Sequence, residues 1–270
     1  MTRGRVLIVA GSDSGGGAGI QADIKTVTAL GGYAATAIAA LTAQNTMGVF
    51  GILDVPPEFV AQQMALVLDD IGADAIKTGM LHCAEVIGVV CDEIAARAPD
   101  VPVVVDPVMV AKGGQALLQD AAQQALRDRL LPLAAVLTPN VPEAEALTGR
   151  AIVSDADMEA AARALLAMGP KAVLLKGGHR EGPVVRDLLV TREGIETFEA
   201  PRIETKHTHG TGCTLASAVA TGLAQGRPLK DAVARAHAYV QAAIRAAPGL
   251  GKGKGPLGHG HTVRPFETPS

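Results

Sequence analysis

The sequence predicts an α/β protein in which helices cover both faces of a mostly parallel central sheet. Short apolar runs alternate with helical segments along most of the chain, and this alternation is typical of parallel βαβ units. Hydrophobic residues make up 48% of the 270 residues but aromatic residues only 2%, so the core must be packed from aliphatic side chains. The sequence shows neither a repeat nor an interdomain linker, and one domain can reach this length. We therefore expect a single domain.

Strands and helices alternate regularly through the first part of the chain. Val6–Ala10 reads as a buried strand, because it is short, rich in branched residues and bounded by Gly-Ser-Asp. The helix expected from about Ala18 to Leu30 ends at Gly31-Gly32, since glycine stops a helix. The other elements expected here are strands at Ala35–Leu41, Asp74–Lys77 and Val101–Val105, and helices at 57–68, opened by Pro56-Pro57, and at Ala84–Arg97.

The second part of the chain continues this order and adds a hairpin. Arg186–Thr191 and Ile195–Ala200 are joined by Arg192-Glu193-Gly194, and a short connection with a glycine favours an antiparallel pair. The other expected elements are helices at Gln119–Leu131, Pro142–Leu147, Met158–Met168, Cys213–Ala224 and Leu229–Ala246, and strands at Ala135–Leu137 and Lys171–Leu175.

The last residues differ in composition from the rest. Gly249–His261, written GLGKGKGPLGHGH, is of low complexity, and its composition alone favours a mobile tail. We therefore divide the chain into a main domain at residues 1–248 and a Gly/Lys/His-rich C-terminal tail at residues 249–270.

Charge and cysteine content exclude several classes of protein. A net charge of −3 without a long basic run argues against a nucleic-acid binder, which needs a clustered basic face. The three cysteines form no CxxC pair, so we expect neither a zinc site nor a disulfide framework. The N-terminal apolar run is shorter than the roughly 7–15 residues of a secretory signal, and no run reaches the roughly 18 of a membrane helix. We therefore expect a cytoplasmic protein.

Polar residues follow six of the predicted strands. Ligands of an open parallel sheet bind beyond the carboxyl ends of its strands, so these residues should meet at one edge. The six clusters are Gly11-Ser12-Asp13, Thr42-Ala43-Gln44-Asn45, Lys77-Thr78-Gly79-Met80, Asp106-Pro107-Val108-Met109, Thr138-Pro139-Asn140 and Lys176-Gly177-Gly178-His179. With Glu143 at the start of the next helix, this edge holds carboxylates, lysine side chains and glycine turns. Phosphoryl transfer needs metal holders, a cation and oriented amides around the phosphates, and this set supplies them.

The stretch HGTGCTL at residues 209–215 places a glycine turn at the start of an Ala-rich helix. The first amides of a helix lack intrahelical partners and its N-terminal end is positive, so the turn suits an anion. Two rival phosphate patterns fit less well. Gly17–Ala22 matches the dinucleotide-binding pattern GxGxxA, which requires an acidic residue about 20 residues further on, but no acidic residue lies between Asp23 and Asp54. The P-loop pattern GxxxxGK[ST] does not occur. Gly210–Cys213 is therefore the best candidate for holding the phosphates of ATP.

Seven motifs occur together and in order: GSDSGGGAGIQADIKT, LTAQNT, IKTGML, DPVM, LTPNVPEA, LLKGGH and THGTGCTLASA. This ordered set resembles the hydroxymethylpyrimidine and phosphomethylpyrimidine kinases of thiamine biosynthesis, which have the ribokinase-like fold. The match runs from about Val6 to the GPLGHGH tail. The resemblance implies a cytoplasmic homodimer that uses ATP and Mg²⁺. Its two steps would phosphorylate 4-amino-5-hydroxymethyl-2-methylpyrimidine and then the resulting monophosphate.

The resemblance also implies roles for individual residues. Gln44 would read the aminopyrimidine, since one amide offers both a donor and an acceptor. The other implied substrate contacts are Asp23, Gly11, Met80 and Val108. Asp106 and Glu143 would hold Mg²⁺. The residues implied at the ATP phosphates and at the reacting group are Lys176, Asn140, Thr208, Gly210, Thr211, Gly212 and Cys213.

Cys213 is implied at the position where sugar kinases of this fold carry an Asp base. A helix N-terminus lowers the pKa of a thiol, so we expect Cys213 to be partly thiolate. The thiol then acts either as a modest base or only as a neighbour that shapes the pocket, and the sequence leaves both roles open.

Four other functions fit parts of the sequence. A pyridoxal kinase of the same fold is the nearest alternative, because its substrate is also a ring with a hydroxymethyl group. A sugar kinase is less compatible with Cys213 in the Asp position. A cysteine hydrolase would pair Cys213 with His209 or His207, but it leaves the carboxylates and Lys176 without a role. A regulator that only binds a phosphorylated pyrimidine would use the same glycine turn.

Overall fold

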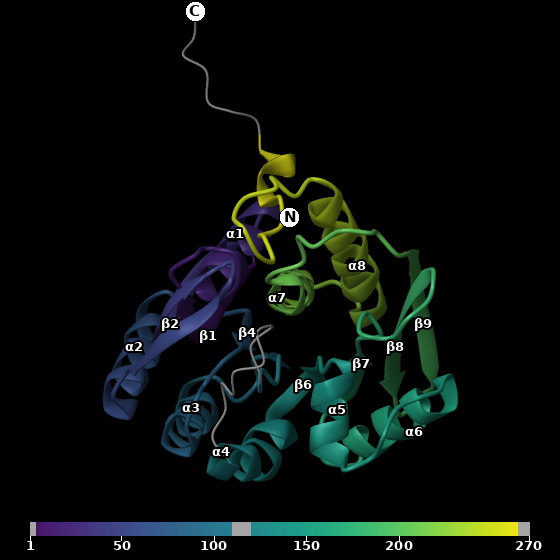
Figure 1. The fold of residues 1–270 in the computed structure, drawn as a ribbon. Helices are drawn as coiled ribbons and strands as arrows, with labels where there is room; N and C mark the ends of the chain where they lie inside the picture. The colour runs from purple at the N-terminus through teal and green to yellow at the C-terminus, as the bar shows by residue number, and fades with distance from the viewer. Residues whose placement is uncertain (1–3, 110–119, 264–270) are drawn as a thin grey trace, which may run out of the picture.

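A single nine-stranded sheet forms the centre of the part of the chain that the computed structural model describes, residues 4–109 and 120–263 (Figure 1). Its strand order is β3-β2-β1-β4-β5-β6-β7-β8-β9. The strands are β1 (Arg5–Asp13), β2 (Tyr33–Asn45), β3 (Gly48–Asp54), β4 (Ala75–Thr78), β5 (Val103–Val105), β6 (Ala134–Leu137), β7 (Ala172–Leu175), β8 (Val184–Thr191) and β9 (Ile195–Pro201).

The six central strands, from β2 to β7 in the sheet order, run parallel to one another. The edge strands β3, β8 and β9 are antiparallel to their neighbours. After β1 the chain first adds β2 on one side and later β4 on the other, so the direction of strand addition reverses at β1. Ligands of open α/β sheets bind at such a switch point, outside the carboxyl ends of the strands.

Helices cover both faces of the sheet, as the sequence predicted (Figure 1). One layer consists of α1 (Gly19–Ala29), α7 (Thr211–Ala224) and α8 (Leu229–Arg245). The opposite layer consists of α2 (Pro57–Asp70), α3 (Ala84–Arg97), α4 (Asp120–Ala125), α5 (Val141–Thr148) and α6 (Asp155–Leu166). Short helical turns occur at Leu126–Leu130, Leu131–Leu133 and His259–Thr262.

Strand β1 shows why the core has two halves. Leu7 and Val9 pack in the cluster beneath α2, α3 and α6, whereas Val6 and Ile8 pack in the cluster beneath α1, α7 and α8. Successive side chains of a strand point to opposite faces, and both faces of a parallel sheet are covered by helices. A continuous apolar run such as Val6–Ala10 therefore belongs at the centre of the sheet.

The predicted strands and helices all occur, with ends that shift by a few residues. The helix predicted at Ala84–Arg97 has these bounds, and the predicted hairpin forms as β8 and β9. The helix predicted at Gln119–Leu131 begins outside the described residues and is irregular after Ala125, and its last turn runs into Pro132. Strand β3 was missed, since glycine at Gly48 and Gly51 hides its pattern.

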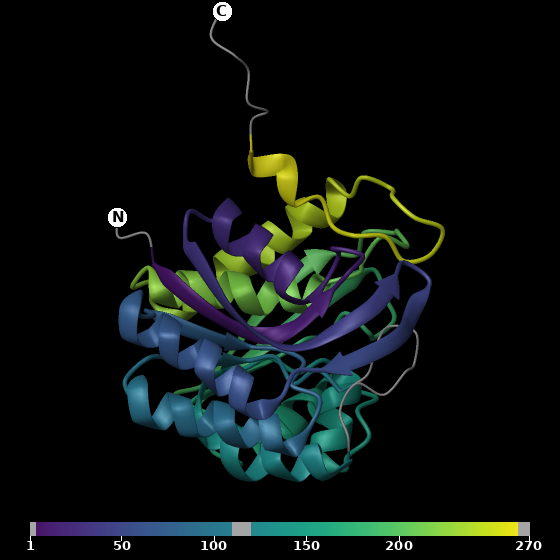
Figure 2. The ribbon, with the colours of Figure 1, turned by 90° about the vertical axis from the view of Figure 1, so that its left-hand side faces the viewer.

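The C-terminal segment at 249–263 is packed on the domain, so the expectation of a mobile tail is wrong for these residues. The N–H of Lys254 donates to the Thr46 carbonyl over 2.9 Å, and the N–H of His209 donates to the Gly255 carbonyl over 3.1 Å. Figure 2 shows the segment, in yellow, looping over the tip of the β2–β3 hairpin. A Cβ atom at Gly253 would lie 2.1 Å from the Thr46 carbonyl oxygen. Glycine is therefore needed here for close backbone approach.

Among residues 4–109 and 120–263, no helix has the length and apolar character that a membrane span requires.

Candidate active site

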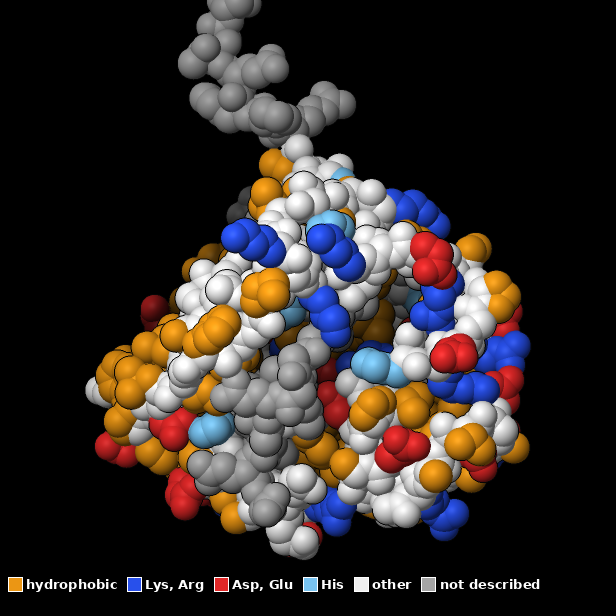
Figure 3. All heavy atoms as spheres, in the orientation of Figure 1, with side chains coloured by type: hydrophobic (Ala, Val, Ile, Leu, Met, Phe, Trp, Pro, Cys, Tyr) orange, Lys and Arg blue, Asp and Glu red, His pale blue; other side chains and the backbone are white. Residues whose placement is uncertain are grey.

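A pocket of about 760 Å³ opens at the carboxyl ends of the parallel strands and appears as the central hollow in Figure 3. Loops from distant parts of the sequence line it, so the predicted edge site does form. The sequence-predicted residues that line it are Gly11, Gln44, Met80, Asp106, Val108, Asn140, Glu143, Lys176, Thr208, Gly210, Thr211, Gly212 and Cys213. Asp23 is the one predicted residue that does not.

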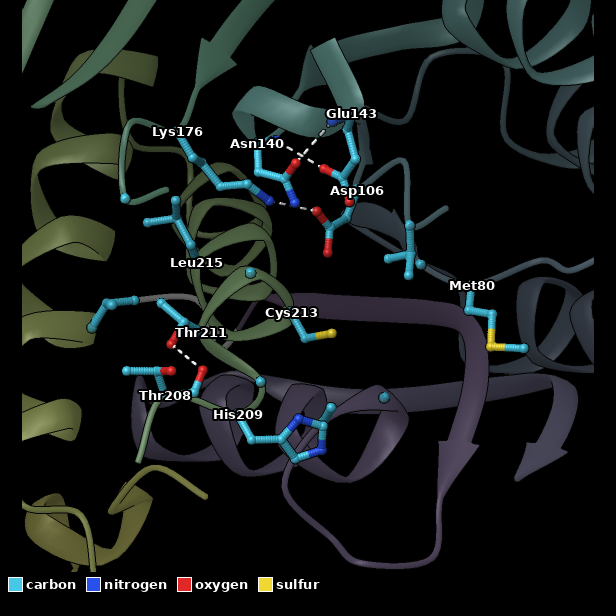
Figure 4. Close-up of a pocket in the computed structure, with 18 of the residues that line it drawn as sticks. Met80, Asp106, Asn140, Glu143, Lys176, Thr208, His209, Thr211, Cys213 and Leu215 are labelled. Carbon is cyan, nitrogen blue, oxygen red and sulfur yellow. Dashed lines mark hydrogen bonds and ion pairs between the residues drawn. The ribbon is translucent and has the colours of Figure 1, made fainter. Parts of the chain in front are cut away.

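The N-terminus of α7 points into this pocket (Figure 4). Gly210 caps the helix with φ of +83°, and a Cβ atom there would lie 1.8 Å from the Gly17 carbonyl oxygen, so only glycine fits. Thr211 donates its hydroxyl to the Thr208 carbonyl over 2.7 Å, which closes the turn. The first intrahelical bond runs from Thr214 N–H to the Gly210 carbonyl. Thr211 N–H also donates to the Thr208 carbonyl over 3.4 Å, so the amides of Gly212 and Cys213 are the ones that this helix end offers to an anion.

Lys176 brings a positive charge to the same place. Its Nζ donates to Asp106 Oδ1 over 2.9 Å, and Thr138 Oγ1 donates to the same carboxylate oxygen over 3.2 Å. A Cβ atom on Gly212 would lie 3.2 Å from Lys176 Nζ, so the lysine and the helix tip face one another. Burial lowers the pKa of Lys176, but the nearby Asp106 and Glu143 carboxylates raise it overall. The side chain is therefore a fixed cation beside the helix tip.

Asn140 and Glu143 form a capping box at the start of α5. Glu143 N–H donates to Asn140 Oδ1 over 2.9 Å, and Asn140 N–H donates to Glu143 Oε2 over 2.8 Å. Burial raises the pKa of Glu143 to about 7; Lys176 opposes this shift and the Asp106 carboxylate adds to it. A cation bound here would favour the ionised carboxylate. Mg²⁺ is commonly held by one or two carboxylates together with substrate phosphates, so Asp106 and Glu143 fit this ion.

No group of three or more His, Cys, Asp or Glu side chains gathers as a metal site in the part of the chain that the structure describes. The Mg²⁺ position expected from the sequence therefore rests on the Asp106 and Glu143 pair.

The shifted pKa of Glu143 predicts how stability depends on pH. The folded protein retains this proton up to about pH 7, whereas an unfolded chain releases it near the ordinary value of 4.5. The stabilisation is complete below 4.5 and is lost as pH rises through 7. Raising pH from about 5 to about 8 should lower the unfolding free energy of metal-free protein by on the order of 2–3 kcal/mol relative to Glu143→Gln. Urea unfolding at a series of pH values measures the difference, and parallel curves for the two proteins would contradict it.

Cys213 lies in the pocket between His209 and Asp106 (Figure 4). Burial raises the pKa of its thiol to about 11, although Lys77 and the Gly19 N–H act in the opposite direction. The expectation of a partly ionised thiol is therefore wrong, because desolvation outweighs the effects of Lys77 and the Gly19 N–H. At neutral pH the neutral thiol is the form that lines the pocket. This favours the role of a neighbour that shapes the pocket.

We expect Cys213 to be unreactive and largely dispensable. A thiol with a pKa near 11 should react with iodoacetamide at pH 8 about 100-fold more slowly than an ordinary cysteine. The variant Cys213→Ala should retain at least about a tenth of the wild-type kcat, since positioning and electrostatics dominate phosphoryl transfer. Mass-spectrometric mapping of alkylation follows the first effect, with urea-unfolded protein as the reactive control. Rapid labelling of native Cys213, or loss of all turnover, would restore the base role.

Gln44 and its apolar neighbours line the same pocket. Met80 packs with Ala40 and, next to it, Val108, so the two predicted walls lie together. Gly11 faces Met80, because a Cβ atom on it would lie 3.2 Å from the Met80 sulfur. On the side of the pocket where the substrate is predicted to bind, the Gln44 amide and an apolar surface therefore line the same cavity.

Asp23 is fully buried behind the pocket, and a direct substrate contact is not met in this structure. Its two carboxylate oxygens accept hydrogen bonds of 3.0 and 2.9 Å from Lys77 Nζ, and Ser217 Oγ donates to it over 2.7 Å. Lys77, which lines the pocket, was not singled out from the sequence. The sequence feature that could have indicated Lys77 is its position at the end of an apolar strand, which it shares with Lys176. Asp23 is therefore connected to the pocket through Lys77 and does not line it itself.

The sheet order, the glycine-capped helix tip and the paired lysine and carboxylates together define a kinase of the ribokinase-like fold. The particular family follows from comparison with known sequences. The phosphomethylpyrimidine kinase family matches residues 13–258, and the chain belongs to this family.

Two curated relatives are similar along nearly the whole chain. The thiamine biosynthesis bifunctional protein ThiED of Geobacter sulfurreducens is 55% identical over 95% of this chain, which spans only 52% of that longer protein. The hydroxymethylpyrimidine/phosphomethylpyrimidine kinase of Streptomyces coelicolor is 51% identical over 94% of each chain. The chain therefore aligns with nearly the whole of the Streptomyces kinase but with only about half of the bifunctional protein.

Two solved structures show the same fold. An ADP complex of Bacillus subtilis pyridoxal kinase is 35% identical with a TM-score of 0.88, covering 96% of this chain and 98% of that one. Phosphomethylpyrimidine kinase from Clostridium difficile 630 is 40% identical with a TM-score of 0.79, covering 89% and 99%. The fold is thus shared by kinases that act on two different ring substrates.

Proposed function

We propose that this protein phosphorylates 4-amino-5-hydroxymethyl-2-methylpyrimidine and then its monophosphate, with ATP as the donor, in thiamine biosynthesis. One observation carries the proposal. The same pocket holds an amide that suits an aminopyrimidine, Gln44, and a phosphate cradle made by the α7 tip and Lys176. Membership of the phosphomethylpyrimidine kinase family supports this choice of substrate.

In this proposal the protein acts mainly by placing positive charge around the phosphates. The amides at Gly210–Cys213 and the Lys176 ammonium neutralise the transferring phosphoryl group, with Thr208 and Asn140 beside the nucleotide. Such oriented donors are often the largest single contribution to catalysis. Asp106 and Glu143 would hold a Mg²⁺ ion, which would supply positive charge at the phosphates. Cys213 fills the space beside the substrate hydroxymethyl group, and Met80 and Val108 pack on the ring.

Pyridoxal kinase is the second candidate, because pyridoxal kinases are close structural neighbours. Purified protein is incubated with MgATP and, separately, hydroxymethylpyrimidine, its monophosphate, pyridoxal and ribose, and ADP is measured. We expect ADP with the first two compounds. ADP with pyridoxal alone would replace the proposal by the second candidate. Turnover without ATP would indicate a hydrolase, and binding without ADP would indicate a regulator.

We also propose that the protein works as a cytoplasmic homodimer, joined through the face of β3 and α2. Phe50 and Leu53 on β3 are 72% and 66% exposed, and Leu66 on α2 is 67% exposed. Figure 3 shows hydrophobic side chains gathered on this side of the molecule. Contiguous exposed apolar surface of this kind commonly marks an interface.

Sedimentation velocity over a range of concentrations tests this interface. The variant Phe50→Asp should weaken the dimer by at least about 10-fold, because a buried unpaired charge opposes association. Val153→Asp is the matched control, since Val153 is 83% exposed on a different surface, in the loop before α6. A wild-type protein that stays monomeric, or equal effects of the two variants, would contradict the proposed interface.

A further inference from the structure

His209 connects two loops of the pocket that are far apart in the sequence. Its Nε2 atom lies 2.9 Å from Asp13 Oδ2 and 3.1 Å from Gln44 Nε2. The imidazole is only 15% exposed and sits beside Cys213 at the pocket wall (Figure 4). The function proposed above assigns no role to the His209 side chain, although His209 contacts the Gln44 amide that would recognise the substrate.

The Asp13 carboxylate fixes which hydrogen His209 carries. Asp13 accepts backbone hydrogen bonds from Gly15, Gly17 and Ala18, at 2.8, 3.1 and 2.8 Å. Burial opposes ionisation of Asp13, but the bonds from His209 and the backbone lower its pKa overall. An ionised carboxylate can only accept, so the His209 nitrogen at 2.9 Å must be an N–H donor.

Thr42 fixes the other end of the Gln44 amide. Thr42 Oγ1 lies 2.9 Å from the Ser12 carbonyl and 3.1 Å from Gln44 Oε1. A carbonyl cannot donate, so the single hydroxyl hydrogen of Thr42 goes to Ser12. The Thr42 oxygen is then left as an acceptor toward Gln44.

These two constraints determine the orientation of the Gln44 amide. In the structure as it stands, Gln44 Nε2 faces His209 Nε2, so two hydrogen-bond donors meet. Gln44 Oε1 faces the Thr42 hydroxyl oxygen, so two acceptors meet. A half-turn of the terminal amide exchanges its oxygen and nitrogen, which have nearly the same shape, and removes both conflicts. The carbonyl oxygen then shares the single His209 Nε2–H with Asp13 Oδ2 in a three-centre hydrogen bond, and the amide nitrogen donates to Thr42.

The fixed amide can form its paired hydrogen bonds to a ligand in one direction only. One lone pair of the Gln44 oxygen and one N–H remain for a ligand, side by side. A 4-aminopyrimidine presents an amino donor next to a ring-nitrogen acceptor, so the two edges pair in one direction only. That direction decides on which side of the amino group the neighbouring hydroxymethyl group lies. Reversing the amide would reverse the docked ring and move the reacting group.

We propose that His209 is a positioning residue that fixes the Gln44 amide, and thereby directs the hydroxymethyl group of an aminopyrimidine toward the phosphate cradle. This inference rests on the proposed function, because it takes an aminopyrimidine as the substrate. It assigns His209 no proton transfer to the substrate. His209 acts through Gln44, and its ring also stabilises the loop that follows Asp13.

A double-mutant cycle separates these two actions of His209. The variant His209→Phe keeps a ring but loses the donor, and should lower kcat/KM for hydroxymethylpyrimidine about 10-fold, the size expected for one lost hydrogen bond. His209→Gln, whose amide can still donate, should recover part of that loss. In a Gln44→Ala background, His209→Phe should change kcat/KM by less than about 2-fold, because there is no amide left to orient.

The outcomes are distinguishable from failure of the function itself. His261→Phe is the control, since His261 is exposed and does not line the pocket. Melting temperatures of all variants show whether each is folded. Equal losses in the wild-type and Gln44→Ala backgrounds would overturn the inference and leave His209 with only its structural bond to Asp13. A wild-type protein that forms no ADP with hydroxymethylpyrimidine would overturn the proposed function and this inference with it.

Discussion

The variant Gly212→Ala is expected to lower kcat at least about 100-fold, the effect of losing oriented donors at a developing anion, without destabilising the protein. A Cβ atom on Gly212 would lie 3.2 Å from Lys176 Nζ and 3.7 Å from Asp106 Oδ2, and no backbone atom is among its near neighbours. The methyl group would therefore occupy the phosphate cradle and leave the packing of α7 unchanged. Alanine also has a higher helix propensity than glycine, which favours the folded state.

Steady-state ADP release and thermal unfolding measure the two parts of this prediction. Gly194→Ala is the matched control, because Gly194 lies in the β8–β9 turn and a Cβ atom there meets nothing within 4 Å. The control should keep wild-type activity. A Gly212→Ala protein with normal kcat would show that the phosphates bind elsewhere. A Gly212→Ala protein that unfolds more easily would show that the glycine serves the fold instead.

The elements of the fold were predictable where local sequence and tertiary context agree. Val6–Ala10 is apolar at every position because both faces of β1 are covered, and Ala84–Arg97 has the apolar spacing of a helix with one buried face. Strand β3 lies at the edge of the sheet, and its glycines and its two exposed apolar residues, Phe50 and Leu53, leave no alternation that marks a strand. The glycines of the C-terminal segment have a tertiary cause, since Thr46 and His207 leave no room for side chains. Composition alone cannot distinguish that cause from flexibility.

The acidic and basic residues of the site were predictable for a topological reason. Asp106 and Lys176 directly follow buried parallel strands, and all such strands end at the same edge. The network of His209, Asp13 and Gln44 was not predictable, since His209 and Asp13 are 196 residues apart and meet only in the folded chain. The high pKa of Cys213 was also missed, because burial depends on packing that no motif records.

The variant Lys176→Met should lower kcat by on the order of 1,000-fold, since it removes the cation beside the helix tip. It should also lower the unfolding free energy by about 3–5 kcal/mol, because one member of a buried ion pair is lost. Asp106 is 2% exposed and Lys176 12%, so little solvent reaches the charge that remains. Loss of activity in this variant alone would therefore not separate catalysis from folding.

The double variant Lys176→Met/Asp106→Asn separates these two causes. Removing both charges leaves no unpaired carboxylate at position 106, so most of the lost stability should return in urea unfolding. The kcat should stay at the low level of Lys176→Met, because neither the ammonium nor the metal-holding carboxylate is restored. Recovery of stability and turnover together would make the lysine a structural partner of Asp106. Recovery of stability alone would show that the loss of turnover comes from the missing charges of the site and is not a consequence of unfolding.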